Sequence, residues 1–126
     1  MIIDSDVLIW YFRGNIKAQT AILENIPFHI SVVTYMELVQ GMRNKAELKL
    51  FHKQLQRWLI NIIHINPDIS ARAMFLVDSF SLSHSMEMAD ALIAATCIHA
   101  KELLLTGNDK HYHFIPQIQI KKFKPE

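Results

Sequence analysis

Residues that mark fibrous, disordered or disulfide-bonded proteins are scarce in this sequence of 126 residues. It has only three glycines and four prolines, and 51% of its residues are hydrophobic, which excludes a collagen-like or disordered chain. Its single cysteine, Cys97, cannot form an internal disulfide, which fits a reducing compartment, and we interpret it as a packed thiol. The composition predicts one globular domain covering residues 1–126.

Long apolar runs and a strong net charge are also absent. The apolar runs fall well short of the ~18 residues of a membrane span, and the first residues lack the basic region of a signal peptide, so we expect a cytoplasmic protein. The 13 basic residues nearly cancel the 12 acidic ones, and a net charge of +1 gives no global signal for nucleic acid. Any surface for a polyanion must therefore come from local clustering.

Apolar runs of strand length alternate along the chain with stretches of helical period, which is typical of repeated strand-helix-strand units. The pattern predicts an α/β fold, a three-layer sandwich in which helices cover both faces of a mainly parallel five-stranded sheet. The expected strands are residues 2–4, 28–31, 62–65, 103–106 and 118–120. The expected helices are residues 7–12, 16–25, a helix from an N-cap at Ser31 to a break near Gly41, and residues 45–59, 68–82 and 85–100.

Acidic side chains occur at places where apolar residues would be expected. Asp4 ends the first apolar run, Glu37 lies in the helix after the second strand, and Asp90 lies within the most apolar helix. Asn108 and Asp109 follow the fourth strand, and ligands of a parallel sheet collect at the carboxyl ends of its strands. A buried carboxylate costs several kcal/mol unless it is paired or bound to a metal. The pattern therefore predicts a shared Mg²⁺ or Mn²⁺ ion, which would relieve the repulsion between these acids.

Each acid also has a simpler structural interpretation. Asp4 could cap the following helix, Thr34 to Glu37 matches a capping box, and the segment before Asp109 has an ordinary turn composition. Asp90 is hardest to explain in this way, because a mid-helix position in an apolar stretch does not favour a carboxylate. The seven histidines include no pair with the helical spacing of a zinc site.

Four segments together resemble a known family. They are Ile3 to Ile9, Ser31 to Leu38, Ala89 to Thr96 and Leu104 to Tyr112, and they are similar to the motifs of PIN-domain proteins, specifically of VapC-type toxins from type II toxin–antitoxin pairs. The resemblance covers the whole chain and implies a PIN-like sandwich.

For the site, the resemblance implies that Asp4, Glu37 and Asp90 are the first three acids of a metal-dependent nuclease, and Asp6 stands where the family often has Asn. The fourth acid falls on Asn108 or on its neighbour Asp109, which we treat jointly. The resemblance further implies an endoribonuclease that uses Mg²⁺ or Mn²⁺ held by Asp4, Glu37, Asp90 and Asp109. It also implies a cognate antitoxin as partner, and a homodimer.

Two other functions remain open at this point. Asp4 to Val7 also matches the nucleophile motif of haloacid-dehalogenase-type phosphatases, although that leaves Glu37 and Asp90 without a role. A PIN-like domain that binds RNA or a partner without cleaving it is the other alternative. Its binding surface would be a basic ridge on the helix at 45–59, formed by Lys45, Lys49, Lys53 and Arg57, which is otherwise a solvated face.

The aromatic residues Trp10, Tyr11 and Phe12 form a cluster that is large to leave in water. We expect an antitoxin or a second copy of the chain to cover part of it. The alternative is that the three side chains pack inside the monomer.

Overall fold

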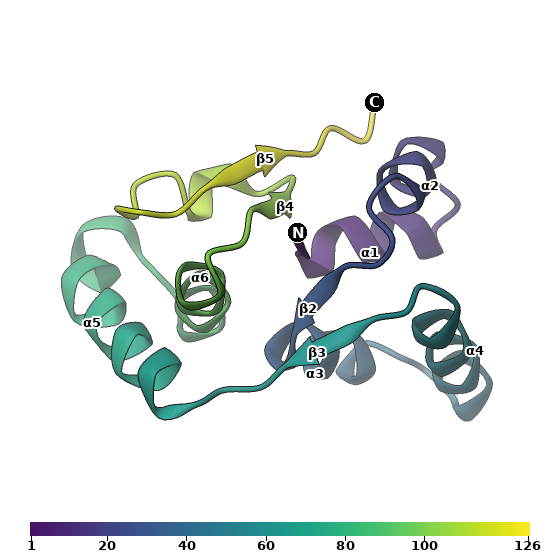
Figure 1. The fold of residues 1–126 in the computed structure, drawn as a ribbon, viewed down its shortest axis with the longest axis horizontal. Coiled ribbons are helices and arrows are strands. Elements are labelled where there is room, and N and C mark those ends of the chain that lie inside the picture. The colour runs from purple at the N-terminus through teal and green to yellow at the C-terminus, as the bar shows by residue number, and fades with distance from the viewer.

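A single parallel sheet organises the computed structural model, which describes residues 1–126 (Figure 1). The strands are β1 (Ile2–Ile3), β2 (His29–Ser31), β3 (Asn61–Ile63), β4 (Leu104–Thr106) and β5 (Ile120–Lys122), arranged in the order β3-β2-β1-β4-β5. The helices are α1 (Ser5–Phe12), α2 (Ile16–Leu23), α3 (Val32–Gln40), α4 (Lys45–Arg57), α5 (Pro67–His84) and α6 (Met88–Ala100), with a short 3₁₀ helix η1 (Asp109–His111). The expected α/β class with a parallel five-stranded sheet is confirmed.

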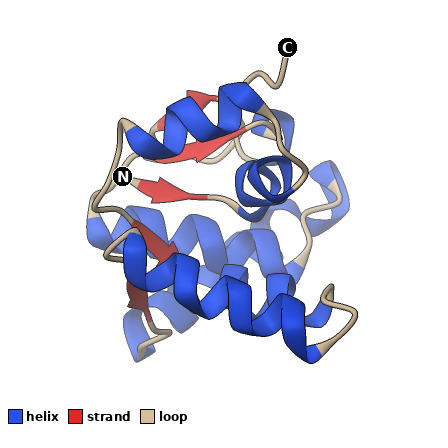
Figure 2. Cartoon of the chain, turned by 90° about the vertical axis from the view of Figure 1, so that its right-hand side faces the viewer, coloured by secondary structure: helices blue, strands red, loops and turns tan.

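The two faces of the sheet have separate cores, because neighbouring strand residues point to opposite sides. Ile2 and Leu104 face a cluster that includes α5 and α6, whereas Ile3 and Leu105 face a cluster formed with α1, α2 and α4. Figure 1 shows α5 and α6 on the opposite side of the strands from these three helices, and Figure 2 shows helices enclosing the short strands. Helices therefore cover both faces, as the uninterrupted apolar strands predict.

Side-chain caps place the beginnings of most helices. Asn15, Ser31, Asn44 and Asn66 each accept a hydrogen bond from a backbone N–H in the first turn of the helix that follows. Such a cap stabilises a helix by about 1 kcal/mol and satisfies a donor that has no partner within the helix. The expected N-cap at Ser31 is confirmed, and it places the start of α3 at the carboxyl end of β2.

Several predicted boundaries are wrong by a few residues. The third strand is Asn61–Ile63 rather than 62–65, because β3 pairs only with the three residues of β2, and β2 ends where α3 begins. The last strand is Ile120–Lys122 rather than 118–120, because β5 pairs with Leu104–Thr106. Neighbouring strands, which the local sequence does not reveal, thus set these ends.

The predicted helix boundaries also need correction near the site. The first helix begins at Ser5 rather than at residue 7, directly after Asp4. Helix α6, coloured green in Figure 1, begins at Met88 rather than at residue 85, because Ser85 adopts a left-handed conformation that ends α5. As a result, Asp4 is the N-cap of α1, and Asp90 lies in the first turn of α6.

The aromatic cluster packs partly within the monomer. Tyr11 makes an edge contact with Trp58 at 4.8 Å between ring centroids, and Trp10 and Tyr11 are half-buried. Phe12 lies 6.0 Å from Phe51, yet 45% of it stays exposed. The intramolecular alternative therefore accounts for part of the cluster, and Phe12 keeps a surface available to a partner.

Other expectations concern single positions. The Cys97 thiol is buried, and burial raises its pKa to about 12, as expected for a packed thiol. The four cations of the basic ridge on α4 are exposed, and their contact with RNA stays a prediction. None of the helices has the length and apolar character needed to cross a membrane.

Candidate active site

Asp4 is a buried carboxylate at the carboxyl end of β1, with 4% of the residue exposed. Its Oδ1 accepts a hydrogen bond from the Ser5 backbone N–H at 2.8 Å, so Asp4 does cap α1, as one interpretation of the sequence expected. Its Oδ2 accepts from the Thr106 hydroxyl at 2.9 Å and from the Tyr112 hydroxyl at 3.1 Å. Burial raises the pKa of Asp4, although these hydrogen bonds favour the charged form.

Asp90 faces Asp4 from the start of α6. The Tyr112 hydroxyl lies 3.2 Å from Asp90 Oδ1, and His111 Nδ1 lies 3.3 Å from Oδ2. Burial raises the pKa of Asp90, and the nearby His111 opposes this rise. One hydroxyl oxygen thus lies between Asp4 Oδ2 and Asp90 Oδ1, so the two carboxylates face the same small space.

The sequence argument for Asp90 used the wrong helix position. Because α6 begins at Met88, Asp90 lies in its first turn and not in the middle of the helix. Carboxylates are favoured there by the partial positive charge of the helix N-terminus. The position of Asp90 on its helix therefore does not distinguish a structural from a functional acid, and its contacts with Tyr112 and His111 carry the argument instead.

Glu37 lies on α3 with its carboxylate near the same acids. Burial is the main cause of its raised pKa, and the charges of Asp4 and Asp90 raise it further. The capping-box alternative for Glu37 is wrong, because Ser31 caps α3 and the buried Thr34 hydroxyl has no hydrogen-bond partner. Glu37 interacts instead with the Ser5 side chain, which lowers its pKa, so capping of α3 does not explain its place beside two other carboxylates.

The two candidates for the fourth acid have different partners. The Asp109 carboxylate lies 3.6 Å from Lys122 Nζ on β5, whereas the Asn108 backbone N–H donates to Thr106 Oγ1 at 3.0 Å. Neither side chain is hydrogen-bonded to Asp4 or Asp90. Asp4 and Asp90 are therefore close enough to Glu37 for their charges to raise its pKa. Asp109 instead forms an ion pair with Lys122.

Sequence reasoning placed Asp6 directly after Asp4 at this edge but gave it no role, and it did not assign Glu87 and Tyr112 to the site. Asp6 accepts a hydrogen bond from the Gly107 N–H at 2.8 Å, and burial together with the charge of Asp4 raises its pKa to about 6. The charge of Glu87 raises the pKa values of Glu37 and Asp90. Two features of the sequence could have pointed to these acids. Asp6 stands at a position where Asn is common in the similar family, and Glu87 lies three residues before Asp90.

The donor set suits a hard divalent cation. No three His, Cys, Asp or Glu side chains are close enough to enclose one ion by themselves. Mg²⁺, however, usually keeps several waters and binds one or two carboxylates together with substrate phosphates, rather than a closed protein cage. Oxygen ligands from Asp4 and Asp90, with Glu37 nearby, match that mode of binding.

Fold and site together define a parallel α/β protein whose site is built from carboxylates at the sheet's carboxyl edge. More narrowly, the family model of the PIN domain matches residues 1–115, and the chain belongs to this family. Strand β5 lies beyond the matched residues but pairs with β4 in the same sheet. The chain is similar to Ribonuclease VapC10 of Mycobacterium tuberculosis, with 29% identity over 94% of this chain and 90% of that protein.

Solved structures share the fold of this chain. A toxin-antitoxin complex from Klebsiella pneumoniae has a chain with 28% identity and a TM-score of 0.73, covering 99% of this chain and 97% of that one. VapBC2 from Rickettsia felis, bound to a DNA fragment from its promoter, has a TM-score of 0.83 at 17% identity and covers 98% of both chains. At that identity the second likeness concerns the fold alone.

Gly107 provides a test of the packing under the site. A Cβ atom there would lie 2.6 Å from Asp6 Oδ2 and 3.2 Å from the Phe123 carbonyl oxygen. Gly107→Ala should therefore destabilise the protein by about 1–3 kcal/mol, measured by denaturant unfolding. The matched control is Gly41→Ala, because its Cβ would meet nothing closer than 3.6 Å and Gly41 has a helical conformation. Equal stability of the two variants would contradict the close approach of Asp6 to Gly107.

The raised carboxyl pKa values predict an unusual pH dependence of stability. Because the folded-state pKa values of Asp4, Asp6, Glu37 and Asp90 lie above their ordinary values, the folded chain binds protons more tightly than the unfolded chain. Their stabilising contribution is complete below the ordinary carboxyl pKa of about 4 and is lost as pH rises through the raised values. In EDTA, Tm should fall between about pH 5 and pH 7, and Mg²⁺ should restore it at pH 7. A Tm that rose steadily over this range in EDTA would contradict the prediction.

Proposed function

We propose that this chain is a metal-dependent endoribonuclease and the toxin of a toxin–antitoxin pair. The observation that carries the proposal is the pair of carboxylates, Asp4 and Asp90, that meet at one hydroxyl beside Glu37. Membership of the PIN-domain family and similarity to a VapC ribonuclease support RNA as the substrate. PIN-domain nucleases of the VapC type generally depend on a divalent metal ion. A cytoplasmic location is part of this proposal, because the RNA that such an enzyme would cut is found there.

The chain's residues suit this chemistry as ligands and as orienting groups. Asp4, Asp90 and Glu37 would hold Mg²⁺ or Mn²⁺, and Asn108 or Asp109 would complete the site. Asp109 could do so only after its ion pair with Lys122 breaks. When bound, such an ion activates a water as nucleophile and neutralises charge that develops on a phosphodiester. Three donors fix the orientation of Asp4, so little reorganisation is needed when the ion binds.

The family and the acids of the site disfavour the phosphatase alternative. Membership of the PIN-domain family argues against a phosphatase, and the hydrogen bonds of Asp4 do not decide the question, because they would occupy its oxygens equally in either enzyme. The second aspartate of that motif, Asp6, binds the Gly107 N–H. Glu37 and Asp90 would also have no role in such an enzyme.

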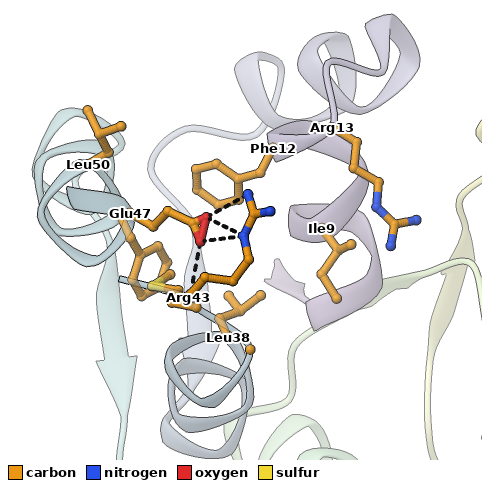
Figure 3. Close-up of a pocket in the computed structure, with 10 residues that line it drawn as sticks. Ile9, Phe12, Arg13, Leu38, Arg43, Glu47 and Leu50 are labelled. Atoms are coloured by element: carbon orange, nitrogen blue, oxygen red, sulfur yellow. Dashed lines mark hydrogen bonds and ion pairs between the residues drawn. The ribbon is translucent and has the colours of Figure 1, made fainter. Parts of the chain in front are cut away.

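An apolar groove between α1, α3 and α4 is where we place the antitoxin. Its cavity of about 690 Å³ is lined by Ile9, Phe12, Leu38, Leu50 and Phe51, and the Arg43–Glu47 ion pair lies among these side chains (Figure 3). Leu50 is 64% exposed and Phe12 is 45% exposed, although both face this hollow. An amphipathic segment of the antitoxin would bury these side chains, in the manner of a helix in a groove.

A cleavage assay tests the proposed activity. The purified protein should cut RNA with Mg²⁺ or Mn²⁺ and stop cutting in EDTA, and Asp90→Asn should reduce cleavage to background. Without metal, the Tm of Asp90→Asn should hold or rise, since the change removes one charge from a repelling cluster. Asp78→Asn on the exposed side of α5 is the control and should cut normally.

Other results of this assay would contradict the proposal. Cleavage by Asp90→Asn at the wild-type rate would remove Asp90 from the mechanism. Hydrolysis of small phosphate esters without RNA cleavage would favour a phosphatase, and RNA binding that never leads to cleavage would favour a binding domain.

A pair of Leu→Glu variants tests the partners. Leu50→Glu places a charge in the groove, so it should keep RNA cleavage but lose inhibition by the co-expressed cognate antitoxin. Leu82→Glu, on the fully exposed outer part of α5 near Phe75, should keep that inhibition. We place the homodimer contact on this α5 surface because its large apolar side chains Met74, Phe75 and Leu82 are at least 66% exposed, so light scattering should show Leu82→Glu as a monomer. Inhibition of Leu50→Glu equal to that of the wild type would exclude the groove.

A further inference from the structure

Tyr112 places a polar atom at the centre of the acidic site from inside the apolar core. The residue is 1% exposed, and its ring belongs to the core cluster that includes Ala91, Ala94 and Leu104. Only the hydroxyl leaves this apolar environment, and its two polar contacts are the carboxylates of Asp4 and Asp90.

The hydroxyl connects three segments that are far apart in the sequence. Asp4 follows β1, Asp90 lies in the first turn of α6, and Tyr112 follows η1. A phenol has a single hydrogen, so it can donate fully to only one of two carboxylates at a time. The oxygen of a neutral group thus occupies the space between two acids that repel each other.

We propose that Tyr112 is a positioning residue of the metal site, whose hydroxyl keeps the Asp4 and Asp90 carboxylates at the spacing that a divalent cation needs. The inference rests on the metal dependence in the proposed function and adds a residue to it. Groups that hydrogen-bond to metal ligands orient those ligands, and their loss typically weakens metal affinity or activity by roughly 10- to 100-fold. Tyr112 contacts two ligands at once.

Removal of the hydroxyl should change the site and leave the fold intact. Phenylalanine fills the same space in the core, so Tyr112→Phe keeps the packing of the ring. Asp4 retains its bonds from Ser5 and Thr106, and Asp90 retains His111. What is lost is the link between the two carboxylates.

A manganese titration of the full chain tests this role. We expect Mn²⁺ binding, followed by electron paramagnetic resonance without RNA, to be roughly 10- to 100-fold weaker in Tyr112→Phe than in the wild type. The control is Tyr35→Phe, which removes a hydroxyl that lies 2.9 Å from His52 Nε2 on the surface, away from the acids. It should bind Mn²⁺ as the wild type does.

The metal dependence of RNA cleavage gives a second readout. The Mn²⁺ concentration for half-maximal cleavage should rise in Tyr112→Phe by the same factor, while kcat at saturating Mn²⁺ stays within about threefold. A purely structural role would lower Tm and leave this concentration unchanged. Unchanged Mn²⁺ affinity in the folded variant would therefore overturn the proposal.

A magnesium titration of the wild-type protein covers the case in which Tyr112→Phe does not fold. Tyrosine ring signals in its NMR spectrum can be assigned with Tyr11→Phe and Tyr35→Phe. The Tyr112 signal should shift on addition of Mg²⁺ while the other two stay in place, and a Tyr112 signal that does not move would overturn the inference. Wild-type protein that binds Mn²⁺ but never cuts RNA would contradict the proposed function alone.

Discussion

The burial of Asp4 is the constraint on which the rest of the site depends. A carboxylate that leaves water loses several kcal/mol of solvation, and the residue is 4% exposed. Donors from Ser5, Thr106 and Tyr112 offset part of that cost, and they connect the ends of β1 and β4 with the segment after η1. The nearby charges of Asp6, Glu37 and Asp90 add repulsion that no protein cation in direct contact with Asp4 relieves. Such an arrangement sacrifices stability and is suited to binding a cation.

The sheet explains why these acids meet. Parallel strands bring their carboxyl ends to one edge, where α1 and α3 begin and η1 follows β4. Because neighbouring strand residues face two separate cores, the strands are packed on both faces, and this packing holds the edge in place. The acids on α3 and α6 then come from helices packed against one another. The sheet and its helices thus determine where the acids lie, and the acids themselves form the proposed metal site.

Much of this could be predicted from the sequence, for physical reasons. Apolar periodicity locates the strands and helices, and Asp4 at the end of a buried strand marks the edge where ligands collect. Strand ends could not be predicted, since β3 and β5 stop where their neighbours stop. Ser85 ends α5 through a left-handed backbone, which shifted Asp90 into a first turn. Tyr112 was missed because a buried tyrosine looks like an ordinary core residue until its hydroxyl is placed in space.

A structure determined with Mn²⁺ tests most directly whether one metal site is built on Asp4 and Asp90. Crystals grown with Mn²⁺ and measured near its absorption edge would locate the ion by anomalous scattering. The account predicts a single strong peak with carboxylate oxygens of both Asp4 and Asp90 at about 2.1 Å, typical of hard divalent ions of this size. A peak confined to other residues, such as His111 or Asp109, with none between Asp4 and Asp90 would contradict it.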